Sequence, residues 1–443
     1  MKPWGAHVYR IGKEEDFDVS NPEATIEPQK KLIEPWLAAV FQSEHLALLL
    51  GSGFTKAVAY QAETNAADMA CDYSVFPLSD ELKNAAQETA KAMGRGKANI
   101  EDQIRAANAL AQGLKILKDS RHVEVTSALD ALFKKFLNGI SKTERELKSA
   151  VEKCVESEPA DSESAVEDKT GEEASERLDP LTMLVSFLLS FSSRTASRER
   201  LHIFTTNYDR LVEHGADLAG LHLIDRFVGC LEPIFRSSRL DIDMHYNPPG
   251  IRGEPRYLEG VVRLTKLHGS LDWSYQKGFV RKVGLPFGPP DNHPTINDQP
   301  SHSVMIYPNA AKDRETAEYP YVELFRDYAA AVCRPNSVLV TYGYGFGDDH
   351  INRTIADMLT IPSTHLVLIS FSDEGGRISS FCRNIGRKAQ ISLLIGSHFG
   401  HMPTLVDNYL PKPAIDRITM RQTELLRNRG WEPSSHKSEE EKI

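Results

Sequence analysis

The chain has 443 residues, of which 41% are hydrophobic and 26% charged, and its formal net charge at pH 7 is −10. This composition is ordinary for a globular protein and supplies ample material for a large core. The negative charge argues against sequence-independent binding to nucleic acid, which depends on basic surfaces. No apolar run approaches the ~18–20 residues needed to cross a bilayer. Because the stretch MKPWGAHVYRIGKEED has no apolar signal core, we expect a cytoplasmic protein.

The cysteines give no sign of a metal site. They are scattered and form no CxxC pair, so a tetrahedral zinc site built on close thiolate pairs is not expected. Reduced, packed thiols are the favoured interpretation for an intracellular chain. The five cysteines are Cys71, Cys154, Cys230, Cys333 and Cys382.

Residues 1–40 read as a polar N-terminal arm followed by a helix. Residues 41–79 open with the apolar run His45–Leu50, which predicts a buried parallel strand, and the turn GSGFT follows at Gly51–Thr55. Its two glycines allow backbone N–H groups to approach a ligand, and a following helix would direct its N-terminus at a phosphate. Taken alone, this pattern favours an ordinary strand–helix turn.

Residues 80–178 predict a helical insertion between the first and second strands of a sheet. Apolar residues at helical spacing mark two faces, and Asn99 is placed to cap one of the helices. The stretch 156–177 holds nine acids against two bases and almost nothing apolar, so we expect an acidic disordered loop there. The insertion is expected to form a lid or an oligomer contact.

Residues 179–410 alternate strand and helix patterns, which predicts an α/β fold with a doubly wound parallel sheet. Three strand patterns end in polar turns: LHIFTTNYDR at 201–210, RLTKLHGSLDW at 263–273 and VLVTYGYGFGDDHIN at 338–352. Open α/β sheets bind ligands at the carboxyl ends of their strands, so these turns and GSGFT should line one crevice. Residues 220–260 read as a long irregular loop, and 411–443 as a C-terminal helix and polar tail.

Each turn also has a structural explanation. A histidine after a strand, such as His268, is more often a hydrogen-bonded structural residue than a catalyst. The Asn-Tyr-Asp turn at 207–209 could simply cap a helix. The glycines at 343–347 could form a flexible turn, with Asp348 and Asp349 interacting with a helix dipole. The joint occurrence of all four turns at strand ends favours a functional site.

In this order, GSGFT, TTNYD, KLHGSLDW and GYGFGDDHIN resemble the sirtuin (Sir2) family, and most closely the sirtuin-like NAD hydrolases of bacterial anti-phage defence. The resemblance covers roughly residues 40–60 and 180–400. GSGFT departs from the family's usual Gly-Ala-Gly-Ile-Ser, and TTNYD replaces the Thr-Gln-Asn-Ile-Asp of deacylating sirtuins. The cysteine-based zinc ribbon of deacylating sirtuins has no counterpart. The resemblance therefore implies a Rossmann-like sirtuin fold with a helical insertion and no zinc ribbon.

The resemblance also implies the site residues. Asn207 would orient a water or a ribose hydroxyl, and His268, with an ordinary pKa near ~6.5, would accept a proton. The substrate would be NAD, with no metal required. The residues expected to bind it are Gly51, Ser52, Gly53, Phe54, Thr55, Thr206, Asp209, Gly343, Tyr344, Gly345 and Phe346.

The function implied is an NAD glycohydrolase that releases nicotinamide and ADP-ribose, acting as an anti-phage effector that depletes cellular NAD. A homo-oligomer and a separate HerA-type ATPase partner are implied as well, and the lack of a GxxxxGK[ST] sequence agrees with that division of labour. Neither a membrane nor direct sequence-specific nucleic-acid binding is expected. The alternatives are a non-catalytic module that binds NAD or ADP-ribose, and an NAD-dependent protein deacylase.

Overall fold

The computed structural model describes most of the chain, with gaps. The predicted acidic loop lies almost entirely outside the described residues, as does nearly all of the predicted C-terminal helix and tail at 411–443. The described residues are 4–12, 15–67, 70–92, 96–157, 180–194, 198–238, 242–247, 256–291, 293–297, 303–305 and 319–412.

The main sheet has nine strands in the order β2-β1-β16-β15-β14-β3-β4-β10-β5. All neighbours from β16 to β5 pair in parallel, and only β1 and β2 are antiparallel additions at one edge. The predicted α/β fold with a doubly wound parallel sheet is confirmed. The strands are β1 (Val8–Arg10), β2 (Phe17–Asp18), β3 (His45–Leu50), β4 (His202–Thr205), β5 (His222–Ile224), β10 (Val261–Lys266), β14 (Ser337–Tyr342), β15 (His365–Ser370) and β16 (Ile391–Ile395).

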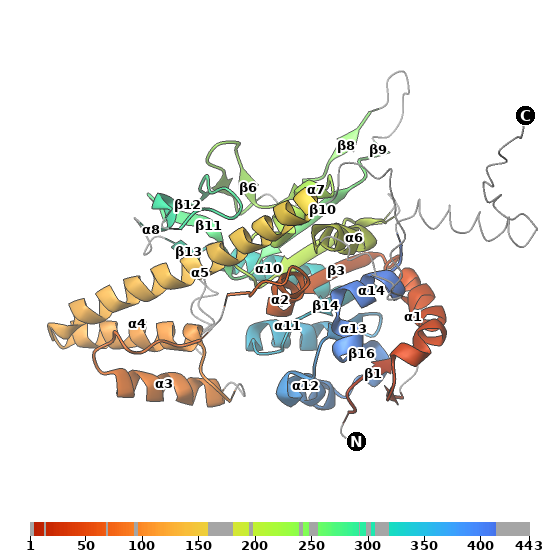
Figure 1. Cartoon of the computed structure of the whole chain (residues 1–443), viewed down its shortest axis with the longest axis horizontal. Coiled ribbons are helices and arrows are strands. Elements are labelled where there is room, and N and C mark those ends of the chain that lie inside the picture. The colour runs from red at the N-terminus through yellow and green to blue at the C-terminus, as the bar shows by residue number, and fades with distance from the viewer. Residues whose placement is uncertain are drawn as a thin grey trace, which may run out of the picture.

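Helices cover both faces of this sheet, as Figure 1 shows. Because side chains alternate along a strand, Leu46, Leu48 and Leu50 of β3 face one core, while Ala47 and Leu49 face the other. The first core is closed by α1 (Ile26–Val40), α2 (Ser52–Gln61), α6 (Pro180–Ser192), α7 (Leu211–Leu218), α13 (Ser397–Gly400) and α14 (Met402–Asn408). The second is closed by α10 (Tyr321–Val332), α11 (Asp349–Met358) and α12 (Arg377–Ile385).

A second, antiparallel sheet adjoins the first, in the order β13-β11-β12-β7-β6. The segment 220–260, predicted as a long loop, supplies short strands to it and to the main sheet, so that prediction is wrong. Strands of two or three residues are too short to show an alternating pattern in the sequence. The second sheet consists of β6 (Phe227–Val228), β7 (Ile234–Phe235), β11 (Gly269–Gln276), β12 (Phe279–Lys282) and β13 (Ser303–Met305). β8 (His245–Tyr246) and β9 (Arg256–Tyr257) pair with each other in a separate two-stranded sheet.

The predicted helical insertion contains α3 (Ser79–Ala92), α4 (Ile100–Ile116) and α5 (Arg121–Ser157), which form an arm beside the sheet (Figure 1). As predicted, Asn99 caps α4: its side chain accepts from the Asp102 amide, and the Asp102 carboxylate accepts from the Asn99 amide. The core of the arm includes Tyr208 and Leu271 from the sheet domain, so the arm is packed onto the loops at the sheet edge. Small helix α8 (Pro294–Asn297) packs against α5.

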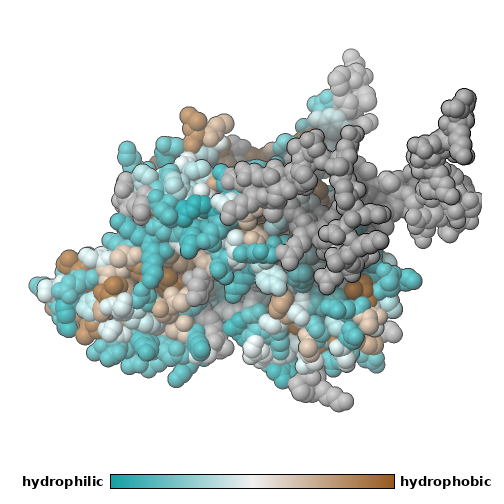
Figure 2. Space-filling view, in the orientation of Figure 1, coloured by the Kyte–Doolittle hydropathy of each residue, from teal (hydrophilic) through white to brown (hydrophobic). Residues whose placement is uncertain are grey.

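The outer end of the arm is apolar. Figure 2 shows hydrophobic residues there, and Ile116 and Leu117, at the end of α4, are 81% and 76% exposed. None of the helices within the described ranges is both long and apolar enough to span a bilayer.

Candidate functional site

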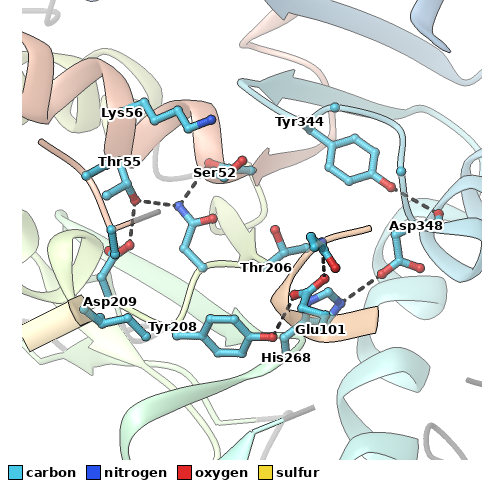
Figure 3. Close-up of a pocket in the computed structure, with 18 of the residues that line it drawn as sticks. Ser52, Thr55, Lys56, Glu101, Thr206, Tyr208, Asp209, His268, Tyr344 and Asp348 are labelled. Carbon is cyan, nitrogen blue, oxygen red and sulfur yellow. Dashed lines mark hydrogen bonds and ion pairs between the residues drawn. The ribbon is translucent and has the colours of Figure 1, made fainter. Parts of the chain in front are cut away.

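The four polar turns meet at one edge of the main sheet, at the carboxyl ends of adjacent strands. β14, β3, β4 and β10 are neighbours, and the chain leaves β3 in one direction toward β4 and β10 and later builds β14, β15 and β16 on its other side. The space between β3 and β14 is therefore the switch point, where doubly wound sheets bind ligands. A cavity of about 370 Å³ opens there, and Figure 3 shows its lining.

Most of the predicted site residues line this cavity, and both predicted catalytic residues are among them. Asn207 follows β4 and His268 follows β10, so the parallel register brings together two side chains 61 positions apart in the sequence. The predicted residues that line the cavity are Gly51, Ser52, Thr55, Thr206, Asn207, Asp209, His268, Tyr344 and Gly345.

Four predicted NAD contacts do not line the cavity. Phe54 is fully buried in the core beneath α2, and Phe346 is buried in the opposite core. Gly53 and Gly343 instead pack against each other, and the absence of side chains lets the two glycine-rich turns approach closely. A Cβ on Gly343, whose φ is +62°, would lie 2.6 Å from the backbone of Gly53. These residues shape the site rather than contact a ligand.

The start of α2 offers fewer backbone N–H groups to a phosphate than predicted, because several of them donate to backbone carbonyls within the two packed turns. The amide N–H of Gly51 donates to the Tyr342 carbonyl at 3.1 Å, and that of Gly53 donates to the Gly343 carbonyl at 2.9 Å. The Phe54 amide donates to Gly51. Ser52 is the first residue of α2, where an amide has no partner inside the helix, so its N–H remains the donor suited to a phosphate.

The side chain of Asn207 is held in one orientation. Its Nδ2 donates to the Gly51 carbonyl at 3.0 Å and to Thr55 Oγ1 at 2.9 Å, and Thr55 Oγ1 in turn donates to Asp209 Oδ2 at 2.6 Å. A carbonyl and an ionised carboxylate only accept, so the nitrogen of Asn207 must face Gly51 and Thr55. Within the described residues, its carbonyl Oδ1 makes no hydrogen bond. The motif therefore presents an amide oxygen for a ligand.

Asp209 is a positioning residue in this arrangement. One carboxylate oxygen accepts from Thr55, and the other accepts from the Leu211 amide at 3.1 Å, which holds the start of α7. The carboxyl is only 9% exposed. The helix-cap interpretation is not borne out in detail, because the N-cap position of α7 is Arg210 and has no side-chain cap. Asp209 instead bonds the amide of the first helical residue and, through Thr55, holds the turn that orients Asn207.

His268 forms a buried pair with a carboxylate that sequence reasoning had treated as part of a helix end. His268 Nε2 lies 3.0 Å from Asp348 Oδ2, and both residues are about 5% exposed. The other oxygen of Asp348 accepts from the His350 amide and caps α11. When the imidazole is neutral, its Nε2–H donates to Asp348, which makes Nδ1 the basic nitrogen. The sequence signal was an acid following GYGFG at the same sheet edge.

The helical insertion, expected to form a lid or an oligomer contact, forms another wall of the cavity, and sequence reasoning did not name the residues that line it. Glu101, at the start of α4, is 7% exposed and accepts a hydrogen bond from the Tyr208 hydroxyl at 3.1 Å. Tyr208 lies between Asn207 and Asp209 in the sequence, and its ring centroid is 6.3 Å from that of His268. Phe136 of α5 packs edge-on against the same ring. The insertion therefore contacts the TTNYD turn directly.

A buried ion pair fixes α5 to the next residue of that turn. Arg210 Nη2 lies 2.6 Å from Glu144 Oε2, and the backbone amide of Arg210 also donates to Glu144, at 2.9 Å. Burial lowers the pKa of Arg210, but its hydrogen bonds and attraction to Glu144 outweigh burial and raise it overall. The Arg210 guanidinium thus remains charged beside Glu144, and the pair holds the insertion in place.

Cationic side chains also reach the cavity. Lys56 of α2, Lys97 ahead of α4 and Arg377 of α12 line it. Arg377 donates to the Gly345 carbonyl at 2.7 Å and pairs with Glu374 at 3.2 Å. In Figure 3, Lys56 and Ser52 lie above the centre of the pocket and Glu101 and His268 below it. Over the described ranges, no group of three or more His, Cys, Asp or Glu side chains is placed to hold a metal ion.

Comparison with protein families agrees with this geometry. Residues 201–390 match the family model described as SIR2-like domain, and domains of that kind use NAD. The matched segment includes the turns that carry Asn207, His268 and Tyr344. The GSGFT turn and the insertion precede it. No curated protein matches the chain.

Proposed function

We propose that the protein is an NAD glycohydrolase, which cleaves NAD with water into nicotinamide and ADP-ribose. The observation that carries this proposal is the orientation of Asn207, whose amide nitrogen is bound by Gly51 and Thr55 so that its oxygen is presented for a ligand. The buried His268–Asp348 pair lines the same cavity. An amide oxygen and a base beside one another suit the cleavage of an N-glycosidic bond by water.

The reaction requires stabilisation of a cation and activation of water. As the bond between C1′ of the ribose and the nicotinamide nitrogen breaks, its electron pair goes to the nicotinamide ring, which becomes neutral, and positive charge builds on the ribose. The Asn207 oxygen is an uncharged dipole that can orient a water or a ribose hydroxyl toward C1′. The water forms the new C1′–O bond and releases a proton.

His268 is the base for that proton. Asp348 holds the ring by Nε2, which favours the tautomer with a basic Nδ1 and stabilises the imidazolium once it forms. Solvent can then take the proton from the imidazolium. Both residues are held on rigid elements, at the end of β10 and the start of α11, so the geometry is set before substrate arrives.

The opposite end of the cavity suits the pyrophosphate. Ser52 at the start of α2 and the ammonium of Lys56 offer donors and positive charge to an anion. Gly345 and Tyr344 line the side that would receive the adenosine ribose. This division supports NAD, which is anionic at its centre, as the substrate.

In the biological role that we propose, the enzyme depletes NAD during anti-phage defence, as a homo-oligomer with a separate HerA-type ATPase. The support is the resemblance of the four turns to the defence branch of the family. The exposed apolar end of the insertion at Ile116 and Leu117 is a surface suited to contact with another chain.

The test is product analysis. The purified chain is incubated with NAD, with and without a candidate ATPase, and nicotinamide and ADP-ribose are separated and quantified. We expect the two products in equal amounts, without any acyl-lysine peptide. Turnover only with such a peptide would indicate a deacylase, and binding of NAD without products under either condition would indicate a non-catalytic module.

A further inference from the structure

The carboxylate that the insertion brings into the cavity is Glu101, whose role the SIR2-like match does not assign, since the matched segment begins at residue 201. Glu101 is the second residue of α4 and lines the cavity together with Asn207 and His268. The inference drawn from it rests on the proposed function, because it names how the same site recognises NAD.

The helix does not need Glu101 to begin. Asn99 and Asp102 already form a reciprocal capping box at the start of α4. An acid in the first turn is favoured by the helix dipole, but a solvent-exposed acid would serve that purpose. Glu101 is instead 7% exposed, and burying a carboxylate is costly unless it is bonded. Its burial in the cavity wall therefore calls for another explanation.

The partners of Glu101 keep the carboxylate in place. Its Oε1 accepts from the Tyr208 hydroxyl and its Oε2 from Asn99 Nδ2, both at 3.1 Å. The other two acids of the cavity have evident structural tasks: Asp209 holds Thr55 and α7, and Asp348 holds His268 and α11. Glu101 differs from them because the insertion supplies it, and it lies in the cavity wall opposite Lys56 and Ser52 (Figure 3).

We propose that Glu101 contacts the nicotinamide–ribose end of NAD⁺, selects the oxidised, cationic ring, and stabilises the positive charge as it moves onto the ribose. The site is suited to a ligand with charges of both signs, because Lys56 and Ser52 lie across the pocket from Glu101 (Figure 3). NAD⁺ has an anionic pyrophosphate and a cationic pyridinium. The Asn207 turn, which holds Tyr208 against Glu101, adjoins both.

In the cleavage step, the positive charge moves from the nicotinamide ring to the ribose. When the C1′–N bond breaks, the electron pair that leaves with nicotinamide neutralises the ring, and the ribose becomes cationic. A carboxylate near this end stabilises the cation before and after the transfer. It accelerates the reaction to the extent that it lies nearer the ribose than the ring. The water then adds to C1′ and gives its proton to His268, so Glu101 itself gains and loses no proton.

A purely positioning role would act through Tyr208. In that case Glu101 would only hold the phenol, and removing the phenol hydroxyl would have the same consequence as removing the charge. Glu101→Gln removes the charge but keeps the size and an acceptor oxygen, whereas Tyr208→Phe removes the hydrogen bond and keeps the charge. The pair of variants separates the two roles.

The experiment measures kcat and KM for nicotinamide release, and binding of NAD⁺, NADH and ADP-ribose in an Asn207→Ala background that slows turnover. We expect Glu101→Gln to lower kcat by on the order of 10²-fold and to weaken NAD⁺ binding roughly tenfold relative to NADH and ADP-ribose. Glu124→Gln, an exposed acid of α5, should retain both the rate and the preference. Tyr208→Phe, which loosens the Glu101 carboxylate but keeps its charge, should retain the preference for NAD⁺ and lower kcat by less than Glu101→Gln does.

Unchanged kcat and unchanged preference in Glu101→Gln would overturn the proposal, as would a Tyr208→Phe variant that reproduces its losses. A thermal melt checks folding. If Glu101→Gln does not fold, Glu101→Asp, which keeps the charge, must retain the preference for NAD⁺ over NADH, and loss of that preference contradicts the proposal. If the unmodified protein releases no nicotinamide, the proposed function fails, and the binding measurements alone decide the role of Glu101.

Discussion

The wall of the cavity built by the sheet edge and the wall built by the insertion place their polar groups by different means. At the sheet edge, Asn207 and His268 follow adjacent parallel strands, so strand register alone brings them together. In the insertion, Glu101 reaches the cavity only because α4 packs against Tyr208. In the proposed reaction, the sheet edge supplies the groups that act on the scissile bond, and the insertion supplies the carboxylate of Glu101.

A buried ion pair between Glu144 and Arg210 joins the two walls of the cavity. Glu144 is fully buried and forms four hydrogen bonds, three of them with Arg210 and one with the Gly288 amide. Glu101 and Glu144 thus hold the residues on either side of Asp209. A change in the position of the insertion would be transmitted to the turn that orients Asn207, which makes the insertion a physical route for control of the site.

The largest effect is expected at the sheet edge, for His268→Ala. Loss of the base should lower kcat by about 10²- to 10⁴-fold, with KM for NAD little changed. Asp348→Asn, which leaves the imidazole but removes its carboxylate partner, should lower kcat by less and alter the pH profile of kcat. Steady-state nicotinamide release across pH measures both. If His268→Ala and the unmodified protein were equally active, His268 would have no role in the chemistry at the sheet edge.

The next effect is expected where the insertion is anchored. Glu144→Ala leaves the buried guanidinium of Arg210 without its carboxylate and should lower the free energy of unfolding by about 3–5 kcal/mol. Urea unfolding measures the change. The matched control is Glu146→Ala on the same helix, whose partner Lys142 is 64% exposed, and its effect should be within about 1 kcal/mol. Similar values for the two variants would mean that the anchor contributes little.

A smaller effect is expected for Thr55→Val, which interrupts the hydrogen bonds that orient Asn207. The valine leaves Asp209 Oδ2 without the Thr55 donor and leaves Asn207 Nδ2 with the Gly51 carbonyl alone, so the free energy of unfolding should fall by about 1–3 kcal/mol. The Asn207 amide can then rotate, and kcat should fall as well. Thr55→Ser keeps the hydroxyl and should preserve both quantities. A Thr55→Val variant with normal kcat would show that Asn207 is oriented without Thr55.

A further effect is a pH dependence of stability that originates in the sheet. Burial lowers the pKa of His202 in β4 well below its ordinary value, with further lowering by nearby arginines, and burial lowers the pKa of His365 in β15 to about 4. Both depressed values mean that the unfolded chain binds protons first as pH falls. Stability should therefore be constant above about pH 6.5 and decline below it by roughly 1 kcal/mol per pH unit for each group.

Urea unfolding at pH 7, 6 and 5 measures this decline. His365→Gln should flatten the slope because it removes one of the two groups, and an unchanged slope would assign the decline to other residues.

The sequence predicted the sheet and most of the residues of its edge that line the cavity, because that information is local. Apolar strand patterns such as His45–Leu50 and polar turns such as TTNYD lie in continuous stretches, and the rule for parallel sheets brings the turns together. It did not distinguish Gly53 and Gly343, which pack on each other, from glycines that would contact a ligand. Both functions require the absence of a Cβ, so the residue type is the same.

The insertion wall could not be predicted because it depends on long-range packing. Glu101 has the sequence context of a first-turn acid, and only its contact with Tyr208, 107 positions away, shows that it lines the cavity. Asp348 likewise read as an acid that interacts with a helix dipole. It caps α11, and its second contact, with His268, is set by the tertiary structure. In both cases one carboxylate has two roles, and the local pattern reveals only one.

The most direct test of the central claim compares nicotinamide release by the unmodified protein and by Asn207→Ala, beside NAD binding measured calorimetrically on both. We predict that the substitution reduces turnover by on the order of 10³-fold, while folding and NAD affinity remain within a few-fold. An Asn207→Ala variant that releases nicotinamide at a near-normal rate would contradict the account.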